Sequence, residues 1–425
     1  MAPLNIPRIP GILRISQVEG AAMYHIRGWI LALFLLQLGS PGFLSGETFR
    51  YKHQTGDKYR IISRVSENVY VNRRFSHRSE IVNRIAAEVL GVQNGLAQHE
   101  VVFQTAERAV GEDEVPRFVW NREYLSVFGR NSQGYITIAP QYFMPVVRNV
   151  PIFPDKDLSP TDGWTAEGYE MHDFRVSFGI EDPYQIPFTA SYTFLGDREW
   201  QGVRYPAFSV SYRIFAAPEE VSAKVYPVRI MGASDQVVYW DRALGQAAAY
   251  EEHFRMVFTL SNGATIEYRG RAEAELVESE TMDKEYMVEE ITEDIKRLGL
   301  GDVSVRVTDE GIAITLEDIQ FQADSAVLTP EEQHKLDSIG AILKRYEDRD
   351  ILVGGHTALA GSVAGRMRLS LERAEAVADY LMEQGIRRED RVVVRGYGAE
   401  RPLADNATDA GRRRNRRVEI TILEN

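Results

Sequence analysis

The feature that most constrains the fold is a long stretch without helical periodicity, residues 47–277. Apolar and polar residues alternate along it in short runs separated by turn residues. Tyr59 and Ile61 form one such run, and Val69 and Val71 form another beyond a Ser-Glu-Asn turn. Alternation with a period of two places successive side chains on opposite faces of a strand. No helix of ordinary length is required before residue 270, so we expect a mostly-β structure here.

Turn signals divide this stretch into hairpins. Asn-Gly pairs at residues 94–95 and 262–263 each separate two alternating runs, which is a strong signal for a tight β-hairpin. A Gly-Asp pair at residues 196–197 predicts a further turn. Apolar residues in 81–89 fit either a helical stripe or a strand, and we favour the strand because of the Asn-Gly turn that follows.

Prolines mark an interruption of the β-rich stretch. Five of them fall within residues 140–160. Proline has no backbone N–H to donate to a β-ladder, and it restricts the backbone conformation of the residue before it. We therefore expect an N-terminal β-rich domain at 47–142, a proline-rich connector at 143–160 and a central β-rich domain at 161–277. One larger β domain is the alternative to two small ones.

The first 46 residues carry an export signal. A short basic start at Met23 precedes an apolar run, Trp29–Leu38, and small residues follow it. The run has the length of a signal-peptide core and is short for a membrane span. Residues 1–46 are thus interpreted as an upstream segment and signal peptide, cleaved after Gly42 or Gly46, which leaves no transmembrane span in the mature chain. An uncleaved anchor is the alternative.

The pattern changes near residue 278. Residues 278–300 are acidic with helical spacing and predict a helical linker. In residues 301–425, strands alternate with helices. One helix starts at Thr329, the expected N-cap, with proline at the first helical position. Such alternation predicts an α+β domain in which helices cover one sheet face, an α/β sandwich.

Composition excludes several functions. The net charge of −13 argues against nucleic-acid binding, because a phosphate backbone would be repelled. The absence of cysteine excludes thiol chemistry and disulfides. The histidines show no metal-binding spacing, and no nucleophile elbow or phosphate loop is present, so we expect no catalytic residue, metal or cofactor. His172-Asp173 is interpreted as a strand histidine rather than half of an acid-base pair, since no nucleophile can be assigned.

Several ordered motifs in the last third of the chain resemble one family. They are Phe321, Gly-His-Thr (355–357), Leu-Ser-Leu-Glu-Arg-Ala-Glu-Ala-Val (369–377), Gly-Tyr-Gly (396–398) and Gly-Arg-Arg-Arg-Asn-Arg-Arg-Val-Glu-Ile (411–420). Their order and spacing resemble the C-terminal domain of the outer-membrane protein A (OmpA) family. The resemblance implies a periplasmic domain that holds peptidoglycan by the diaminopimelate of the stem peptide.

The resemblance also implies a binding pocket, from which this chain departs. In the family, an aspartate after Gly-His-Thr meets the ligand's ammonium, and the arginine of the Leu-Ser-x-x-Arg-Ala motif meets its carboxylate. An asparagine three residues before that leucine assists. Here the arginine is Arg373, but the aspartate position holds Ala358 and the asparagine position Arg366. The ligand-binding candidates are thus Arg373, Arg366, Ala358, Thr357 and His356, in a pocket that prefers an anion.

Two hypotheses follow for this pocket. In one, the domain has lost wall binding and serves as a scaffold that packs against envelope proteins. In the other, it binds a stem peptide without diaminopimelate, such as one with ornithine, or another wall carboxylate. Arg373 also fits a simpler role as a framework arginine paired with a carboxylate, and His356 one of stabilising the strand end through a backbone bond.

The sequence as a whole indicates a non-enzymatic scaffold or tether in the periplasm, in association with the outer membrane. A functional wall anchor linking peptidoglycan to the outer membrane is the first alternative. A hydrolase with a site in the β domains is the second, and it requires acidic pairs that meet in one cleft.

Overall fold

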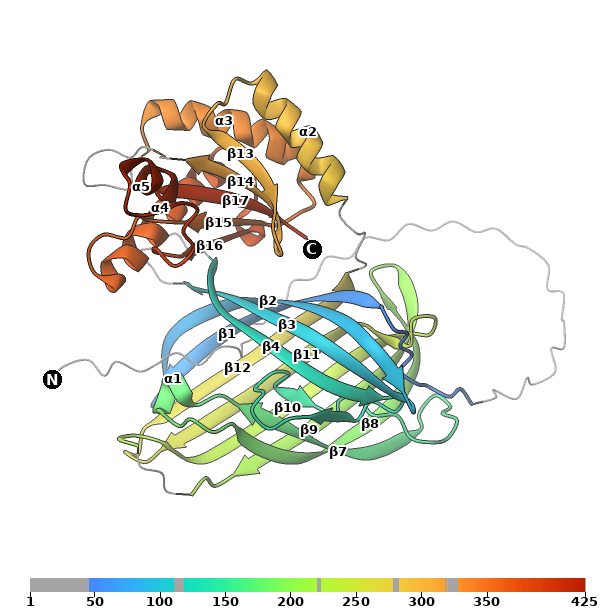
Figure 1. Cartoon of the computed structure of the whole chain (residues 1–425). Coiled ribbons are helices and arrows are strands. Elements are labelled where there is room, and N and C mark those ends of the chain that lie inside the picture. The colour runs from blue at the N-terminus through green and yellow to red at the C-terminus, as the bar shows by residue number, and fades with distance from the viewer. Residues whose placement is uncertain are drawn as a thin grey trace, which may run out of the picture.

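The computed structural model describes residues 46–110, 118–219, 223–277, 283–317, 319 and 328–424. The predicted signal peptide and Phe321 lie outside these residues. Figure 1 shows a large curled sheet formed by the first part of the chain, with a smaller sheet and its helices beside it, formed by the last part. Within the described ranges, no helix is both long enough and apolar enough to cross a membrane.

The large sheet is antiparallel throughout. Its strands follow the order β5-β4-β3-β2-β1-β12-β11-β10-β9-β8-β7-β6. They are β1 (Lys58–Val71), β2 (Arg74–Gln93), β3 (Leu96–Val110), β4 (Phe118–Asn131), β5 (Ile136–Ile138), β6 (Val147–Arg148), β7 (Gly163–His172), β8 (Tyr184–Trp200), β9 (Val203–Ala216), β10 (Pro227–Asp241), β11 (Gln246–Leu260) and β12 (Thr265–Val277). A single helical turn, α1 (Arg175–Phe178), interrupts them. The mostly-β prediction for this region is confirmed.

The Asn-Gly hairpins are confirmed, and two other turn predictions are wrong. Asn94 and Gly95 both have positive φ and connect β2 to β3. The Ser-Glu-Asn segment lies inside β1, whose turn is formed instead by Asn72 and Arg73, both with positive φ. Gly196 also lies within a strand, where the β8–β9 register shifts, because a positive-φ glycine accommodates a bulge as well as a turn.

Pairing between the first and last strands joins the two predicted β-rich segments. β1 pairs with β12 from Arg60↔Val277 to Val71↔Ile266, and with β2 on its other side. One sheet therefore contains strands from both 47–142 and 161–277, as in the alternative of one larger β domain. Local turn signals could not reveal this, because they specify only the pairing of neighbouring strands.

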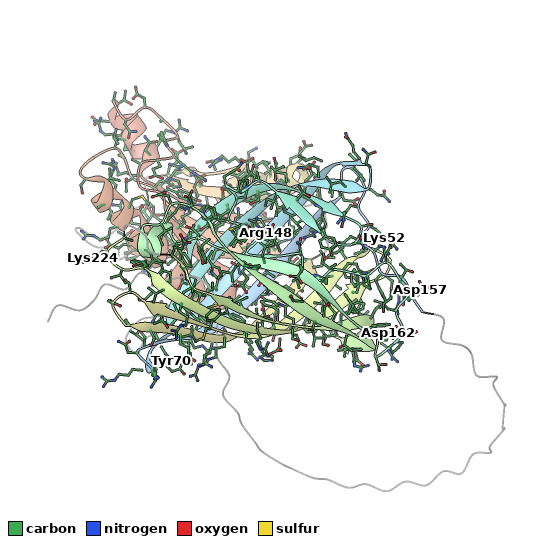
Figure 2. The ribbon with its side chains drawn as sticks, turned by 90° about the horizontal axis from the view of Figure 1, so that it is seen from below. Lys52, Tyr70, Arg148, Asp157, Asp162 and Lys224 are labelled. Atoms are coloured by element: carbon green, nitrogen blue, oxygen red, sulfur yellow. The ribbon has the colours of Figure 1, made fainter. Side chains whose placement is uncertain are left out.

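The proline-rich segment, predicted as a connector, packs into the β region. Phe153 and Leu158 are fully buried in an aromatic cluster with Phe49, Phe208 and Trp240. Arg148, labelled near the centre of Figure 2, is buried and donates hydrogen bonds to nearby backbone carbonyl groups. The segment thus forms part of the wall of the curled sheet.

The C-terminal part alternates strands and helices as predicted. Its elements are α2 (Lys284–Arg297), β13 (Val303–Val307), β14 (Gly311–Glu317), α3 (Pro330–Leu343), β15 (Ile351–Gly355), α4 (Val363–Glu383), β16 (Val392–Gly396), α5 (Asp409–Asn415) and β17 (Arg417–Leu423), with single 3₁₀ turns at Lys344–Tyr346 and Glu389–Arg391. The strand order is β13-β14-β17-β15-β16. Thr329 caps α3 as expected, accepting a hydrogen bond from the amide of Glu332.

One core joins these strands to α2, α3 and α4. It includes Ile291 of α2, Leu336 of α3 and Leu381 of α4, all inaccessible to solvent, packed on Val353 and Ile420 of the sheet. The acidic segment predicted as a linker therefore supplies a helix of this core, because its apolar stripe faces inward while Glu285, Glu289 and Glu293 face solvent. Asp294 is the buried exception, and it pairs with Arg297 and Arg345.

The opposite face of the smaller sheet packs on the larger one. Leu352, Val393 and Leu423 form a buried cluster with Phe118 and Trp120 of β4. β16 also pairs in parallel with the start of β4 for two residues. An ion pair between Arg84 and Asp350 crosses the same contact. Figure 1 shows the smaller sheet lying over β1–β4 with its helices on the far side.

Candidate functional site

Close packing of α4 on two strand ends forms the base of the predicted pocket. A Cβ atom on Gly355 would lie 1.8 Å from the carbonyl oxygen of Ser370, and one on Gly396 would lie 2.7 Å from its Oγ. The glycines of Gly-His-Thr and Gly-Tyr-Gly thus allow α4 to approach the sheet. The Ser370 hydroxyl donates to the Met367 carbonyl group and accepts from the Gly398 amide at 2.9 Å.

Substitution of Gly396 by alanine should destabilise the chain. The added methyl group meets backbone atoms of α4 as well as the Ser370 hydroxyl, so helix or strand must shift. We expect a loss of about 1–3 kcal/mol in the free energy of unfolding, measured by urea denaturation. Gly301→Ala is the control, because nothing lies within 4 Å of its added Cβ. Equal effects of the two substitutions would contradict the packing argument.

Backbone hydrogen bonds bring the motifs that carry the resemblance together. The His356 amide donates to the Arg417 carbonyl group at 2.9 Å, and the Thr357 amide donates to the Gly398 carbonyl group at 2.8 Å. The Leu359 amide donates to Oδ1 of Asn406 at 2.9 Å. The turn that begins the candidate pocket is therefore fixed against three separate segments.

His356 lies beneath this turn as a neutral, buried ring. It stacks on Tyr397 with ring centroids 4.7 Å apart and planes nearly parallel. Burial, together with the nearby Arg417, lowers the pKa of His356 to about 3. The imidazole consequently carries no charge at neutral pH. The ring packs under the turn, but both ring nitrogens lack a hydrogen-bond partner among the described residues, and the bond to the Arg417 carbonyl group comes from the main-chain amide.

Thr357 and Ala358 follow directly at the strand end. Thr357 is 7% exposed, and its buried hydroxyl has no hydrogen-bond partner among the described residues. Ala358 is 8% exposed, so a methyl group occupies the place where the family resemblance implies a carboxylate. The resulting turn offers an unused hydroxyl group but no negative charge.

Both predicted arginines lie on α4. Arg366, in its first turns, is partly buried and donates from Nη1 to the carbonyl group of Gly361 at 2.5 Å, so it folds back over the turn. Arg373 lies two turns further along, is partly buried and has partners within the chain. Arg368 faces solvent 3.5 Å from Glu372. The turn and the start of α4 therefore present more positive than negative charge.

Sequence reasoning missed two asparagines that hold the rim of the turn. Asn415 is fully buried; its Oδ1 accepts from the amides of Leu403 and Ala404, and its Nδ2 donates to Oδ1 of Asn406. Asn406 in turn binds the Leu359 amide. The available signal is the asparagine within the Gly-Arg-Arg-Arg-Asn-Arg-Arg run, but the charge of the surrounding arginines masks it in the sequence.

The His172-Asp173 pair is not an acid-base unit in the structure. His172 Nε2 lies 2.9 Å from Glu170, whereas Asp173 binds the Arg175 guanidinium and accepts from the Tyr124 hydroxyl. Although burial opposes it, the bonds from Arg175 hold the pKa of Asp173 below its usual value. The two side chains therefore have different partners, as expected of a structural histidine.

The last quarter of the chain contains an OmpA family domain, at residues 320–416. Outer membrane porin F of Pseudomonas fluorescens is 36% identical over 105 residues, 25% of this chain and 32% of that protein. The peptidoglycan-binding protein ArfA of Mycobacterium tuberculosis is 38% identical over 110 residues, 26% of this chain and 33% of ArfA. The probable lipoprotein YiaD of Escherichia coli is 36% identical over 128 residues, 30% of this chain and 58% of YiaD. These matches thus span from about a third to just over half of the relatives' lengths.

Proposed function

We propose that the protein is a non-enzymatic scaffold or tether of the periplasm, associated with the outer membrane, whose OmpA domain has an altered peptidoglycan pocket. The observation that carries the proposal is the turn after β15, where Ala358 is buried and Arg366 folds over the loop. The names of the relatives, which include a peptidoglycan-binding protein and an outer membrane porin, support the compartment.

The pocket should discriminate against diaminopimelate. That residue presents an ammonium group beside a carboxylate, and the carboxylate that would bind the ammonium is absent at Ala358. Losing one charge-assisted hydrogen bond costs roughly 1.5–3 kcal/mol, about ten- to a hundredfold in affinity. Arg366 adds like-charge repulsion toward an ammonium group.

A carboxylate is the ligand group that suits what remains. Arg366 and Arg373 supply positive charge, and the Thr357 hydroxyl is a buried donor without a partner among the described residues. A stem peptide with ornithine in place of diaminopimelate retains its main-chain carboxylates, and when its side-chain amine is acylated, as in a cross-link, it presents no ammonium group to Arg366. Such a peptide is our preferred ligand, and a scaffold without wall binding is the competing form of the proposal.

Binding of defined stem peptides to the exported chain tests the proposal. We expect saturable binding of an ornithine-type peptide whose side-chain amine is acylated, measured by calorimetric titration, and at least about tenfold weaker binding of the diaminopimelate type, which keeps a free ammonium group. Arg373→Ala should abolish binding, whereas Arg368→Ala on the exposed side of α4 should not. Absence of binding to either peptide would leave the scaffold form; preference for diaminopimelate would refute the altered pocket.

Ala358→Asp should restore recognition of diaminopimelate. The substitution supplies the missing carboxylate at the end of β15, so we expect affinity for the diaminopimelate peptide to rise about ten- to a hundredfold. Ala358→Asn is the matched control, because it has the same shape without the charge. If both variants bind no better than the parent, the identity of residue 358 does not determine specificity.

A conventional wall anchor is the second candidate function. The 38% identity to a protein named as peptidoglycan-binding favours it. In that case the diaminopimelate peptide binds the parent chain as tightly as it binds Ala358→Asp, so the same titrations separate the two candidates.

A further inference from the structure

The curled β sheet encloses a cavity that the proposed function does not use. Two adjoining spaces of about 250 and 330 Å³ lie on its inner side. They share the wall residues Ser63, Asn83, Tyr250 and Glu252, which come from β1, β2 and β11. The interior therefore continues from one space into the other past Glu252.

Most of the wall is apolar. Strand alternation places Val65, Ile81, Met256, Phe258 and other apolar side chains on the inner face of the sheet. On β8 the same alternation leaves polar residues outside, where Gln185 and Thr189 are exposed and Ile186 is buried. An apolar interior of this size suits the hydrocarbon or aromatic body of a small molecule.

The proline-rich segment separates the cavity from solvent between the two sheet edges. Met144, Val146 and Val147 line both spaces, and Val146 is 38% exposed. Next to it, the Tyr124 hydroxyl of β4 donates to Asp173 at the end of β7, at 3.2 Å. This hydrogen bond therefore connects β4 to the residue that follows β7, beside the proline-rich segment.

Charged side chains also line the two spaces: Arg122, Glu170, Asp173 and Glu252 in one, and Arg130, Glu252 and Glu275 in the other. Asp173 is paired with Arg175, and the two carboxylates that bear on the proposal are Glu170 and Glu252. Glu170 accepts from the Tyr212 hydroxyl at 3.0 Å and lies 2.9 Å from His172 Nε2. Glu252 accepts from the Ser234 hydroxyl at 2.6 Å and from the Gln236 amide at 3.1 Å, both at Oε1. Neither contact neutralises Glu252, and both leave Oε2 available at the junction of the two spaces.

The chemistry of this junction favours a cation. Burial, with the neighbouring Glu170, raises the pKa of Glu252 to about 7. A buried carboxylate is costly unless a positive partner compensates it. Glu252 has hydroxyl and amide donors only, so a ligand ammonium group at Oε2 would supply the missing charge, with its apolar body in the adjoining spaces.

We propose that this cavity is a binding site for an elongated apolar molecule with a primary amine, whose ammonium group pairs with Glu252. The site is independent of the pocket on α4, since it lies within the large sheet and shares no residue with that pocket. Its ligand would be held by apolar burial and oriented by one charge pair.

Fluorescence titration with a matched pair of probes tests the proposal. Monodansylcadaverine carries an apolar ring and a primary amine, and its N-acetyl derivative has the same body without charge. At pH 8, where Glu252 is largely ionised, we expect the full exported chain to bind the amine at least about tenfold more tightly than the acetylated probe. Equal affinities, or no saturable binding of either probe, would overturn the proposal.

Variants assign the site within the protein. Glu252→Gln should reduce the affinity for the amine about tenfold or more and leave the acetylated probe unchanged. Glu273→Gln, on an exposed position of β12, should change neither. Ala233→Leu and Ala272→Leu narrow the cavity from two different strands. Whichever of these variants retains the parent's circular dichroism spectrum should bind both probes more weakly. Unchanged amine binding in Glu252→Gln would refute the role of this residue.

Discussion

Asp350→Ala is expected to destabilise the full chain by about 3–5 kcal/mol. The Asp350 side chain is 2% exposed and forms an ion pair with Arg84, which is also largely buried. Arg391 lies 3.6 Å from the same carboxylate. Removing Asp350 leaves the Arg84 guanidinium buried without its carboxylate, and the desolvation of that charge is then uncompensated.

Urea denaturation of matched variants measures this effect. Asp348→Ala is the control, because that side chain is 76% exposed and we expect a change within about 0.5 kcal/mol. In a double-mutant cycle, Arg84→Met combined with Asp350→Ala should cost less than the two single changes added together. Additive effects would mean that the two side chains do not interact across the contact between the sheets.

This ion pair illustrates what the sequence could not predict. Arg84 and Asp350 are separated by 266 positions, and neither lies in a motif that suggests a partner. The pairing of β1 with β12 is equally remote. Strand alternation and turn residues specify which face of a strand is buried and where neighbouring strands connect, but not which distant strand supplies the next ladder.

Sequence signals predict local structure correctly where the residue type serves a single structural purpose. The Asn94-Gly95 turn and the Thr329 cap were both correct, because a two-residue turn needs positive φ and a helix start needs a side-chain acceptor. Gly196 was assigned to a turn but lies in a bulge, since both features use the same conformational freedom.

The positions of the motifs predict where the candidate pocket lies, and the residues that differ from the family pattern predict its chemistry. The structure brings the Gly-His-Thr turn against Gly398 and Arg417. The hydrogen bond from Arg366 to Gly361 and the support from Asn406 could not be inferred, because they depend on the path of the loops. The carboxylates inside the cavity could not be inferred either, since Glu170 and Glu252 look like ordinary polar residues of alternating strands.

Glu252 provides the second large prediction, a stability that depends on pH. Its pKa is raised from 4.5 to about 7, so the folded state holds this proton more tightly than the unfolded state does. The stabilisation from that proton is complete below pH 4.5 and is lost as the pH rises toward 7 and beyond. The difference corresponds to about 3 kcal/mol, from 1.36 kcal/mol per pKa unit.

Glu252→Gln should therefore stabilise the protein by about 3 kcal/mol at pH 8 and by about 1 kcal/mol at pH 5. The amide keeps an oxygen that can accept from Ser234, and it never ionises inside the apolar cavity. The free energies of unfolding of variant and parent are compared by urea denaturation at each pH. Their difference removes the pH dependence of ionisable groups that both proteins share, such as Tyr212 and Tyr250. Glu273→Gln, exposed on β12, should show no such trend. An equal gain in the free energy of unfolding at pH 5 and pH 8 would contradict this prediction. It would mean that Glu252 is charged in the folded protein throughout this range, or that its packing rather than its ionisation destabilises the parent.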